Sequence, residues 1–152
     1  MSLSRRNAFT RLAVAASAGA LAWRTAEAAA APAPETVPRV VYHLADADKV
    51  GFVLGNIDNH FKGMGGTDRV HIALVVHGPA LAAFETVRAD GALRAHFAAI
   101  AAQGVDLGAC GNTLDAQGLT VAELLPGFSR IDEGGVVRLA RLQGEGYAYL
   151  RP

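Results

Sequence analysis

The 152-residue sequence contains a single cysteine, Cys110, so no disulfide bond can form within the chain. It also lacks the motifs of several common enzyme classes. There is no nucleophile elbow of the form G-x-S-x-G. The glycine-rich stretch 63–66 follows a helical pattern and not a strand, which indicates a turn and not a phosphate-binding loop. No H-x-x-H or C-x-x-C spacing supports a metal site. We therefore expect no cofactor, no bound metal and no hydrolase or nucleotide-binding activity.

The N-terminal sequence has the features of an export signal. Basic residues at Arg5, Arg6 and Arg11 precede an apolar run over residues 12–23, and residues 26–28 fit an A-x-A cleavage site. A retained membrane anchor is the alternative, but a spanning helix needs about 20 apolar residues. The run is shorter than that, so we expect cleavage and no stable membrane insertion afterwards.

The arginine pair also fits the twin-arginine pattern, which is used to export folded proteins. The sequence thus predicts a twin-arginine signal peptide over residues 1–28, a flexible linker over 29–38, one domain over 39–152, and a periplasmic location. About 120 residues remain after cleavage, enough for one hydrophobic core.

Charge argues against a nucleic-acid partner. The full chain has 14 basic and 14 acidic residues, and residues 1–28 hold four of the basic ones but only one acidic one. The domain that remains is mildly acidic and has no lysine- or arginine-rich run to neutralise phosphates.

Strand and helix patterns alternate along the domain. Short β-branched or apolar runs predict strands at 39–44, 69–77, 105–110, 128–132 and 147–150. Three- and four-residue spacing predicts helices from Asp46 to about Gly63, over 81–100 with a break near Asp90, over 120–125 behind a capping box, and over 136–143. Such alternation predicts a doubly wound α/β fold, a mainly parallel sheet with helices on both faces.

Ligands of such folds collect beyond the carboxyl ends of the strands. His43, His77 and Cys110 stand at those ends of the three strongest predicted strands, and turn-forming or polar residues follow each of them. We therefore expect two imidazoles and the only thiol at one edge of the sheet.

Two interpretations of Cys110 are open. A free cysteine is often simply a small buried apolar residue. Alternatively, Gly111 permits a close backbone approach or a positive φ, Asn112 and Thr113 supply polar partners, and a helix starting at Thr120 can favour the thiolate. In an oxidising compartment an exposed thiol reacts, so a lone one is either buried or used.

The two histidines also have alternative interpretations. Each can be a structural residue that bonds a backbone carbonyl at a strand end. A histidine near a cysteine can also lower its pKa, and two histidines with one thiolate could bind a transition metal. The other histidines, His60, His71 and His96, are predicted to be structural, solvated or subunit-contact residues.

Several segments together carry a resemblance: VVYHLADADKVGFVLGNIDNHFKG, VHIALVVHGPAL, GVDLGACGNTL, LLPGF and RLQGEGYAYLRP. The sequence resembles the DsrE/DsrF-like family of small α/β proteins, in particular its stand-alone exported branch, over residues 39–152. The resemblance implies a parallel sheet flanked by helices and homo-oligomers such as trimers or hexamers. It also implies sulfur transfer through a cysteine persulfide, with Cys110 at the position of that cysteine.

Two functional hypotheses follow. In the first, the protein handles sulfur: Cys110 accepts and passes on sulfane sulfur between a donor and an acceptor protein, supported by His43, His77, Asn112, Thr113 and the amides around Gly111. Its activity would be that of a sulfur carrier or transferase at most. In the second, the protein is a non-catalytic oligomer that binds a small ligand or metal, and Cys110 is a buried core residue.

Overall fold

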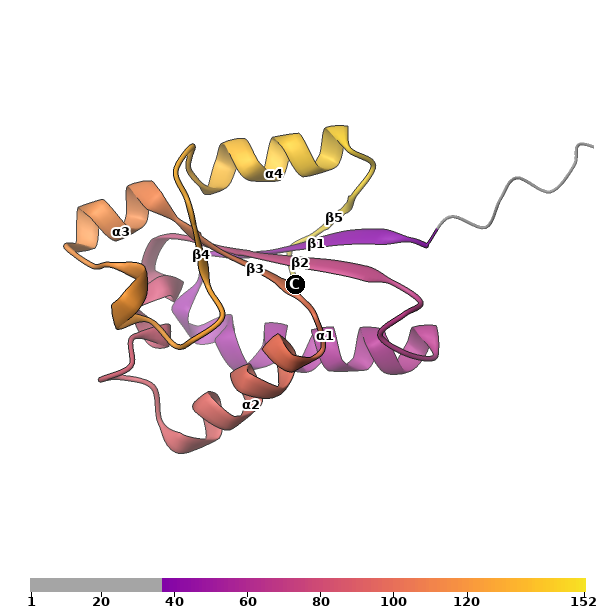
Figure 1. Ribbon diagram of the computed structural model, residues 1–152, viewed down its shortest axis with the longest axis horizontal. Helices are drawn as coiled ribbons and strands as arrows, with labels where there is room; N and C mark the ends of the chain where they lie inside the picture. The colour runs from indigo at the N-terminus through magenta and orange to yellow at the C-terminus, as the bar shows by residue number, and fades with distance from the viewer. Residues whose placement is uncertain (1–36) are drawn as a thin grey trace, which may run out of the picture. The chain divides into compact units, whose positions relative to one another are not determined.

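Five parallel strands form the framework of residues 37–152, the part of the chain that this computed structural model describes (Figure 1). The strands are β1 (Arg39–Leu44), β2 (His71–Val76), β3 (Asp106–Cys110), β4 (Ser129–Ile131) and β5 (Ala148–Leu150). Their order across the sheet is β4-β3-β2-β1-β5, and every neighbouring pair is parallel. The predicted α/β fold is thereby confirmed. The predicted signal peptide and residues 29–36 of the predicted linker lie outside the described residues.

The central strands are buried on both faces. In β1 and in β2, every residue after the first is buried, which is typical of strands covered on both faces. Successive side chains point to opposite faces. Val40 and Tyr42 of β1 therefore join the larger core on one side of the sheet, whereas Val41 joins a smaller core on the other.

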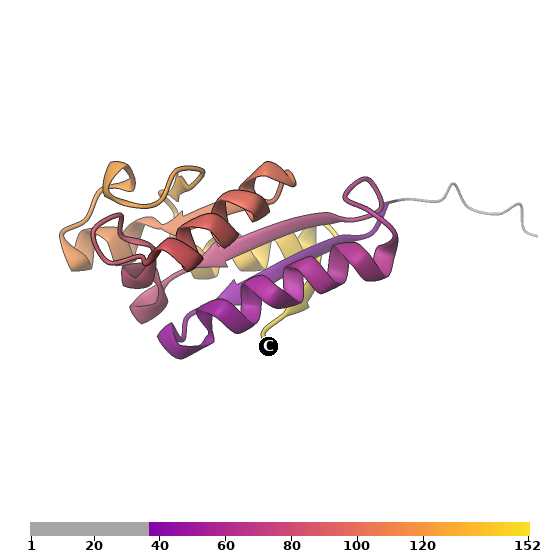
Figure 2. The same ribbon diagram turned by 90° about the horizontal axis from the view of Figure 1, so that it is seen from below.

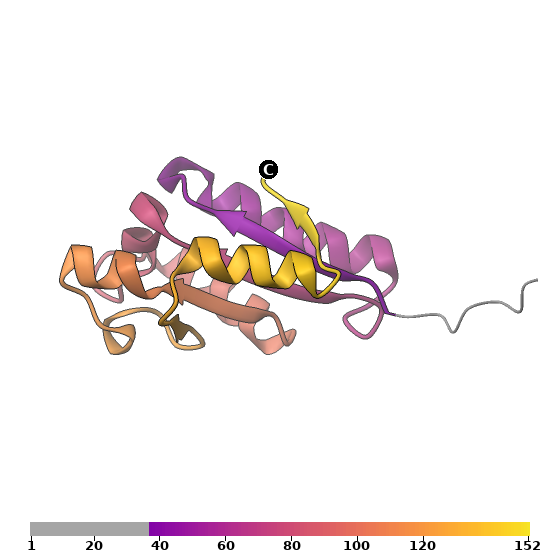
Figure 3. The ribbon, with the colours of Figure 1, turned by 90° about the horizontal axis from the view of Figure 1, so that it is seen from above.

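Helices cover both faces of the sheet. They are α1 (Val50–Met64), α2 (Gly91–Ala102), α3 (Gly111–Gln117) and α4 (Gly135–Gly144), with short 3-10 helices η1 (Ala47–Lys49), η2 (Gly78–Phe84) and η3 (Val121–Glu123). Helices α1 and α2 lie side by side on one face (Figure 2), and α4 lies alone across the other (Figure 3). Among these helices none is both long and apolar enough to cross a bilayer.

The hydrophobic cores on the two faces of the sheet differ in size. The larger core holds three phenylalanines in mutual contact, Phe84, Phe97 and Phe128, with ring centroids 4.8 to 5.2 Å apart. The smaller core consists of strand residues packed against Leu139 and Leu142 of α4. Helix α4 connects the two edge strands, β4 and β5, so its first turn comes close to the carboxyl ends of β2 and β3. This placement creates the candidate site.

The structure corrects two parts of the sequence-based prediction. The first half of the predicted helix 81–100 is instead the 3-10 helix η2, which Pro79 opens. Val87, three residues after Phe84 and so expected on the same helical face, is 89% exposed. The turn-forming or polar residues that follow Cys110 form α3, and Leu114 of this helix is fully buried. The predicted break near Asp90 is confirmed, and Asp90 caps α2 by accepting a hydrogen bond from the amide of Leu93.

Candidate functional site

The sheet register brings the three predicted residues to one edge. His43 is paired with Val75, and Val76 is paired with Ala109. His77 follows Val76 and Cys110 follows Ala109, so His77 and Cys110 lie next to each other at the ends of neighbouring strands. By alternation, their side chains and that of His43 are on the α4 face.

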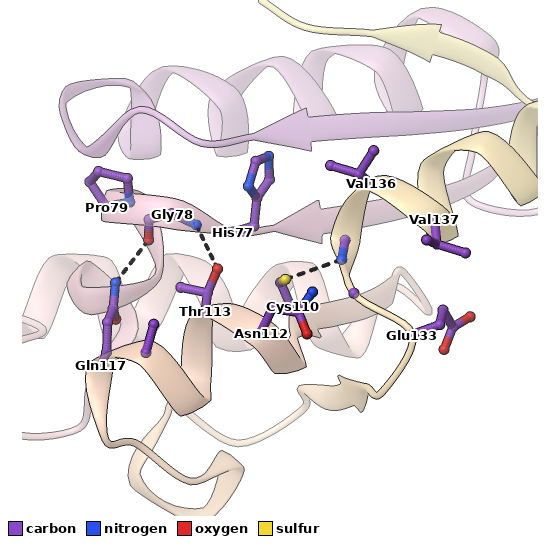
Figure 4. A pocket seen from close by; sticks show the side chains of 13 residues that line it. His77, Gly78, Pro79, Cys110, Asn112, Thr113, Gln117, Glu133, Val136 and Val137 are labelled. Carbon is purple, nitrogen blue, oxygen red and sulfur yellow. Dashed lines mark hydrogen bonds between the residues drawn. The ribbon is translucent and has the colours of Figure 1, made fainter.

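His77 and Cys110 line a pocket of about 600 Å³ (Figure 4). Its wall comes from four places: the start of η2, helix α3, the loop between β4 and α4, and the first turn of α4. Some of the lining side chains are polar, whereas those of Pro79, Val136 and Val137 are apolar. Of the predicted supporting residues, Asn112 and Thr113 also line the pocket, whereas His43 and Gly111 do not.

The thiol of Cys110 is largely shielded but faces this pocket. The residue is only 5% exposed, and its Sγ accepts a hydrogen bond of 3.1 Å from the backbone amide of Gly135 (Figure 4). Burial raises the pKa of the Cys110 thiol, but hydrogen bonds from Gly135, Thr113 and Asn112 together outweigh burial and bring this pKa below its ordinary value. The main donor, Gly135, begins helix α4, where the helix dipole also favours negative charge.

Glycine is needed at two positions around the thiol because the backbone approaches it closely. A Cβ on Gly135 would lie 3.3 Å from Cβ of Cys110 and 3.4 Å from Cβ of His77. A Cβ on Gly111 would lie 2.7 Å from the carbonyl oxygen of Ile131. Gly111 is helical, so of the two roles foreseen for it, a close approach and a positive φ, the structure shows the close approach.

Thr113 links the thiol to the neighbouring loop. Its hydroxyl oxygen accepts a hydrogen bond of 3.0 Å from the amide of Gly78, which leaves the hydroxyl proton free to point towards Sγ of Cys110. This hydroxyl is the second-largest of the contributions that lower the Cys110 pKa, after the Gly135 amide. The end of β2 and the start of α3 are thus joined by a polar contact at the pocket wall.

The two histidines bond to each other and not to backbone carbonyls. Nε2 of His43 is hydrogen-bonded to Nε2 of His77, and Nδ1 of His43 is 2.6 Å from the hydroxyl of Tyr149 on β5. The structural alternative foreseen for each histidine, a bond to a main-chain carbonyl, is absent from residues 37–152. His77 faces the pocket, and His43 lies behind it.

Both imidazoles are held in the neutral form. Burial, the neighbouring His77 and the positive charge of Arg151 lower the pKa of His43 to about 4, although Asp46 opposes this shift. Burial and Arg151 also lower the pKa of His77, again against Asp46. Neither ring therefore carries charge near pH 7, and neither histidine is among the groups that shift the Cys110 pKa. The expected tuning of the thiol by a charged histidine is replaced by tuning through amide and hydroxyl donors.

The site also contains residues that the sequence did not point to. Gly135 and Tyr149 were not predicted, although a Gly-Gly pair directly before a helical pattern is a signal for a close helix N-terminus. The helix foreseen at Thr120 is the short η3 and has its capping box, with Thr120 donating its amide to Glu123. It supplies no hydrogen bond to Cys110, because the amides that reach Sγ belong to α3 and α4.

Two of the three remaining histidines have side-chain hydrogen bonds, and His71 is exposed at the start of β2. His60 is hydrogen-bonded to Tyr42, and His96 to Asp58. Within residues 37–152, no three histidine, cysteine, aspartate or glutamate side chains come together in a group that could hold a metal ion.

Comparison with known proteins assigns this chain to a family. A sequence model of the DsrE/DsrF-like family matches residues 15–152. The chain belongs to the DsrE/DsrF-like family. A solved structure of a protein of unknown function, MTH1491 from Methanobacterium thermoautotrophicum, is 30% identical and has a TM-score of 0.66, and the match covers 76% of this chain and 99% of that one.

A second solved structure is similar in fold. The crystal structure of the ychN protein from E. coli has a TM-score of 0.61 at 18% identity, and the match covers 76% of this chain and 99% of that one. A comparison with curated proteins gives no match. The family is linked to sulfur relay.

Proposed function

We propose that this DsrE/DsrF-like protein is exported and handles sulfur, with Cys110 carrying sulfane sulfur as a persulfide. One observation carries the proposal: the only thiol faces a pocket of about 600 Å³ while a backbone amide at a helix N-terminus donates to its Sγ. The pocket has room for a second sulfur and a small donor. The same donors that lower the thiol pKa would stabilise a persulfide anion.

The transfer step is a displacement at sulfur. The Cys110 thiolate attacks the outer sulfur of a donor R–S–SH. The new Sγ–S bond forms as the S–S bond of the donor breaks, and R–S⁻ leaves with the electron pair. The sulfane sulfur keeps its oxidation state, so no oxidant or reductant is consumed. Passing the sulfur to an acceptor thiolate is the same step in reverse.

Burial of Cys110 suits a thiol in an oxidising compartment. At 5% exposure, the sulfur is shielded from other large thiol proteins, while the pocket admits small molecules. Such a site slows mixed-disulfide formation with bulky partners and leaves reaction with small sulfane-sulfur donors possible.

Mass spectrometry of the intact protein tests persulfide formation. The domain is incubated with polysulfide or thiosulfate and compared with a Cys110→Ser variant. The proposal predicts a gain of one sulfur atom, reversed by a reductant, in the wild-type chain and not in the variant. No gain under conditions that load a known persulfide carrier would contradict it.

The second candidate is a non-catalytic protein that binds a small ligand or metal, and the low exposure of Cys110 favours it. Isothermal titration with copper and zinc, repeated on His43→Ala and His77→Ala, tests the metal version. Loss of metal binding in both variants would support a metal site at the histidines. Metal binding that is unchanged in both variants would exclude such a site.

The expected homo-oligomer, a trimer or hexamer, forms part of the proposal. Apolar side chains exposed on the described surface are consistent with subunit contacts, and Phe52 on α1 and Val136 on α4 are more than half exposed. Light scattering coupled to size-exclusion chromatography tests it, and a strict monomer would contradict it.

A further inference from the structure

A continuous set of hydrogen bonds connects the candidate pocket with the protein surface. The hydroxyl of Tyr149 bonds Nδ1 of His43, and Nε2 of His43 bonds Nε2 of His77. The two ends of this path are more exposed than its middle. Tyr149 is 39% exposed at the edge of the sheet, His43 is only 9% exposed, and His77 lines the pocket. The three side chains come from β5, β1 and the end of β2, which are neighbours in the sheet.

The two imidazoles meet in an orientation that allows proton transfer. Their ring centroids are 4.6 Å apart and their planes differ by 16°. The two Nε2 atoms are within hydrogen-bonding distance of each other, and the two rings are nearly parallel. A bond between two Nε2 atoms requires that one carry the proton and the other accept it. The proton between them can therefore reside on Nε2 of either histidine.

We propose that Tyr149, His43 and His77 form a relay that moves a proton between the Cys110 pocket and solvent. The inference rests on the proposed function, because sulfur transfer to Cys110 begins with loss of the thiol proton. His43 and Tyr149 act through His77 and are positioning residues.

The relay has two states that differ by the position of every proton in it. In the first, His77 donates from Nε2 to His43, and His43 donates from Nδ1 to the Tyr149 oxygen, whose own proton points to solvent. When His77 takes a proton from the pocket at Nδ1, its Nε2 proton passes to His43. The Nδ1 proton of His43 then passes to Tyr149, and the original phenol proton leaves to solvent. The reverse sequence returns a proton to a leaving thiolate in the pocket.

This sequence never requires a charged imidazole at rest, which agrees with the surroundings. Burial and the positive charge of Arg151 hold the pKa of both histidines low, while Asp46 opposes them. Asp46 and Arg151 are themselves paired at 3.1 Å. On the pocket side the acidic group is Glu133, which pairs with Arg141 of α4 at 2.8 Å. The relay is thus bordered by two ion pairs, in which each carboxylate is engaged by an arginine.

The rate of sulfur loading across pH tests the relay. Tyr149→Phe removes the solvent end of the path and leaves the ring in place. Tyr147→Phe is the matched control, since Tyr147 packs against the smaller core two residues earlier. We expect Tyr149→Phe to slow loading about tenfold below the thiol pKa and to match the wild type at pH 9, where the thiol is already ionised. A purely structural effect would lower the rate equally at every pH.

Nitrogen-15 NMR of the histidine rings tests the same inference without sulfur chemistry. Both rings should stay neutral at pH 6 with one protonated nitrogen each, and Tyr149→Phe should change which nitrogen of His43 holds the proton. His71→Gln, at an exposed strand position, serves to assign signals without disturbing the pair. Titration of either ring near pH 6.5 would overturn the relay. So would a His43 tautomer that is the same in Tyr149→Phe and in the wild type.

The two measurements separate the two claims. If the wild-type chain takes up no sulfur, the proposed function fails and the NMR result alone decides the relay. If the chain is loaded but Tyr149→Phe behaves like the wild type at every pH, the relay is wrong and sulfur carriage stands.

Discussion

The backbone amide of Gly135 donates a hydrogen bond of 3.1 Å to Sγ of Cys110, joining the first turn of α4 to the end of β3 across 25 residues of sequence. This contact accounts for a thiol that is buried and yet has a lowered pKa. It depends on the absence of a side chain at residue 135, since a Cβ there would press on Cys110, His77 and Val75.

Gly135→Ala is therefore expected to raise the Cys110 pKa. The added Cβ would meet atoms at 3.3 to 3.4 Å, so α4 must shift and the amide must retreat from the sulfur. The pH dependence of the thiolate absorbance measures the change. Gly144→Ala, in the same helix but with open space around its Cβ, is the matched control. Equal pKa values in the two variants would show that Gly135 does not tune the thiol.

Thr113→Val is expected to raise the same pKa by a smaller amount. The substitution removes the hydroxyl that contributes to the lowered pKa and leaves the amide of Gly78 without its acceptor. Thr67→Val, at an exposed turn, is the control. Rates of reaction with a small disulfide across pH give the Cys110 pKa of both variants. A rate profile in Thr113→Val that matches the wild type would count against a role for the hydroxyl.

Acid is expected to destabilise the domain through His43. The folded-state pKa is about 4, below the ordinary value of 6.5, so the unfolded chain binds more protons between these values. The stability contributed by the neutral ring is complete above pH 6.5 and is lost as the pH falls towards 4, by about 1–2 kcal/mol at pH 5.

Urea unfolding at pH 7 and pH 5 measures this loss, with His43→Gln as the comparison. The variant should show a smaller difference between the two pH values than the wild type. His71→Gln, which alters an exposed histidine, should behave like the wild type. Identical pH dependence in His43→Gln and the wild type would mean that the ring is not held neutral by the fold.

Leu114→Ala is expected to loosen α3 and, with it, the pocket. Leu114 is fully buried, and removing such a side chain costs about 2–5 kcal/mol of unfolding free energy. Because α3 carries Asn112 and Thr113, the variant should also raise the Cys110 pKa. Val87→Ala, at a position that is 89% exposed, should change neither quantity. A stable Leu114→Ala protein with an unchanged thiol would show that α3 does not position the donors.

The sequence predicted the strand ends well because each central strand is marked by its own residues. Val40 and Val41 mark β1, and residues 72–76 mark β2, so His43, His77 and Cys110 could be placed at one edge from local pattern alone. Pattern did not identify α3, since Leu114 is the only large apolar residue of this short helix and gives no apolar repeat to recognise.

The groups that define the chemistry come from pairings that local pattern does not encode. Tyr149 reaches His43 because β5 lies beside β1, and Gly135 reaches Cys110 because α4 crosses the sheet. Both contacts depend on strand order. The sequence indicated the elements that carry these residues but not which neighbours they would meet, and so it favoured the histidines over backbone amides as partners of the thiol.

The central claim is that Cys110 is an activated thiol reached through the pocket, and thiol titration of the folded domain tests it most directly. The folded and the denatured protein are reacted with a small aromatic disulfide across a range of pH. The account predicts rapid reaction of the folded protein with an apparent pKa below the value of about 8.5 for a free thiol. Reaction only after denaturation would contradict it and would make Cys110 a core residue.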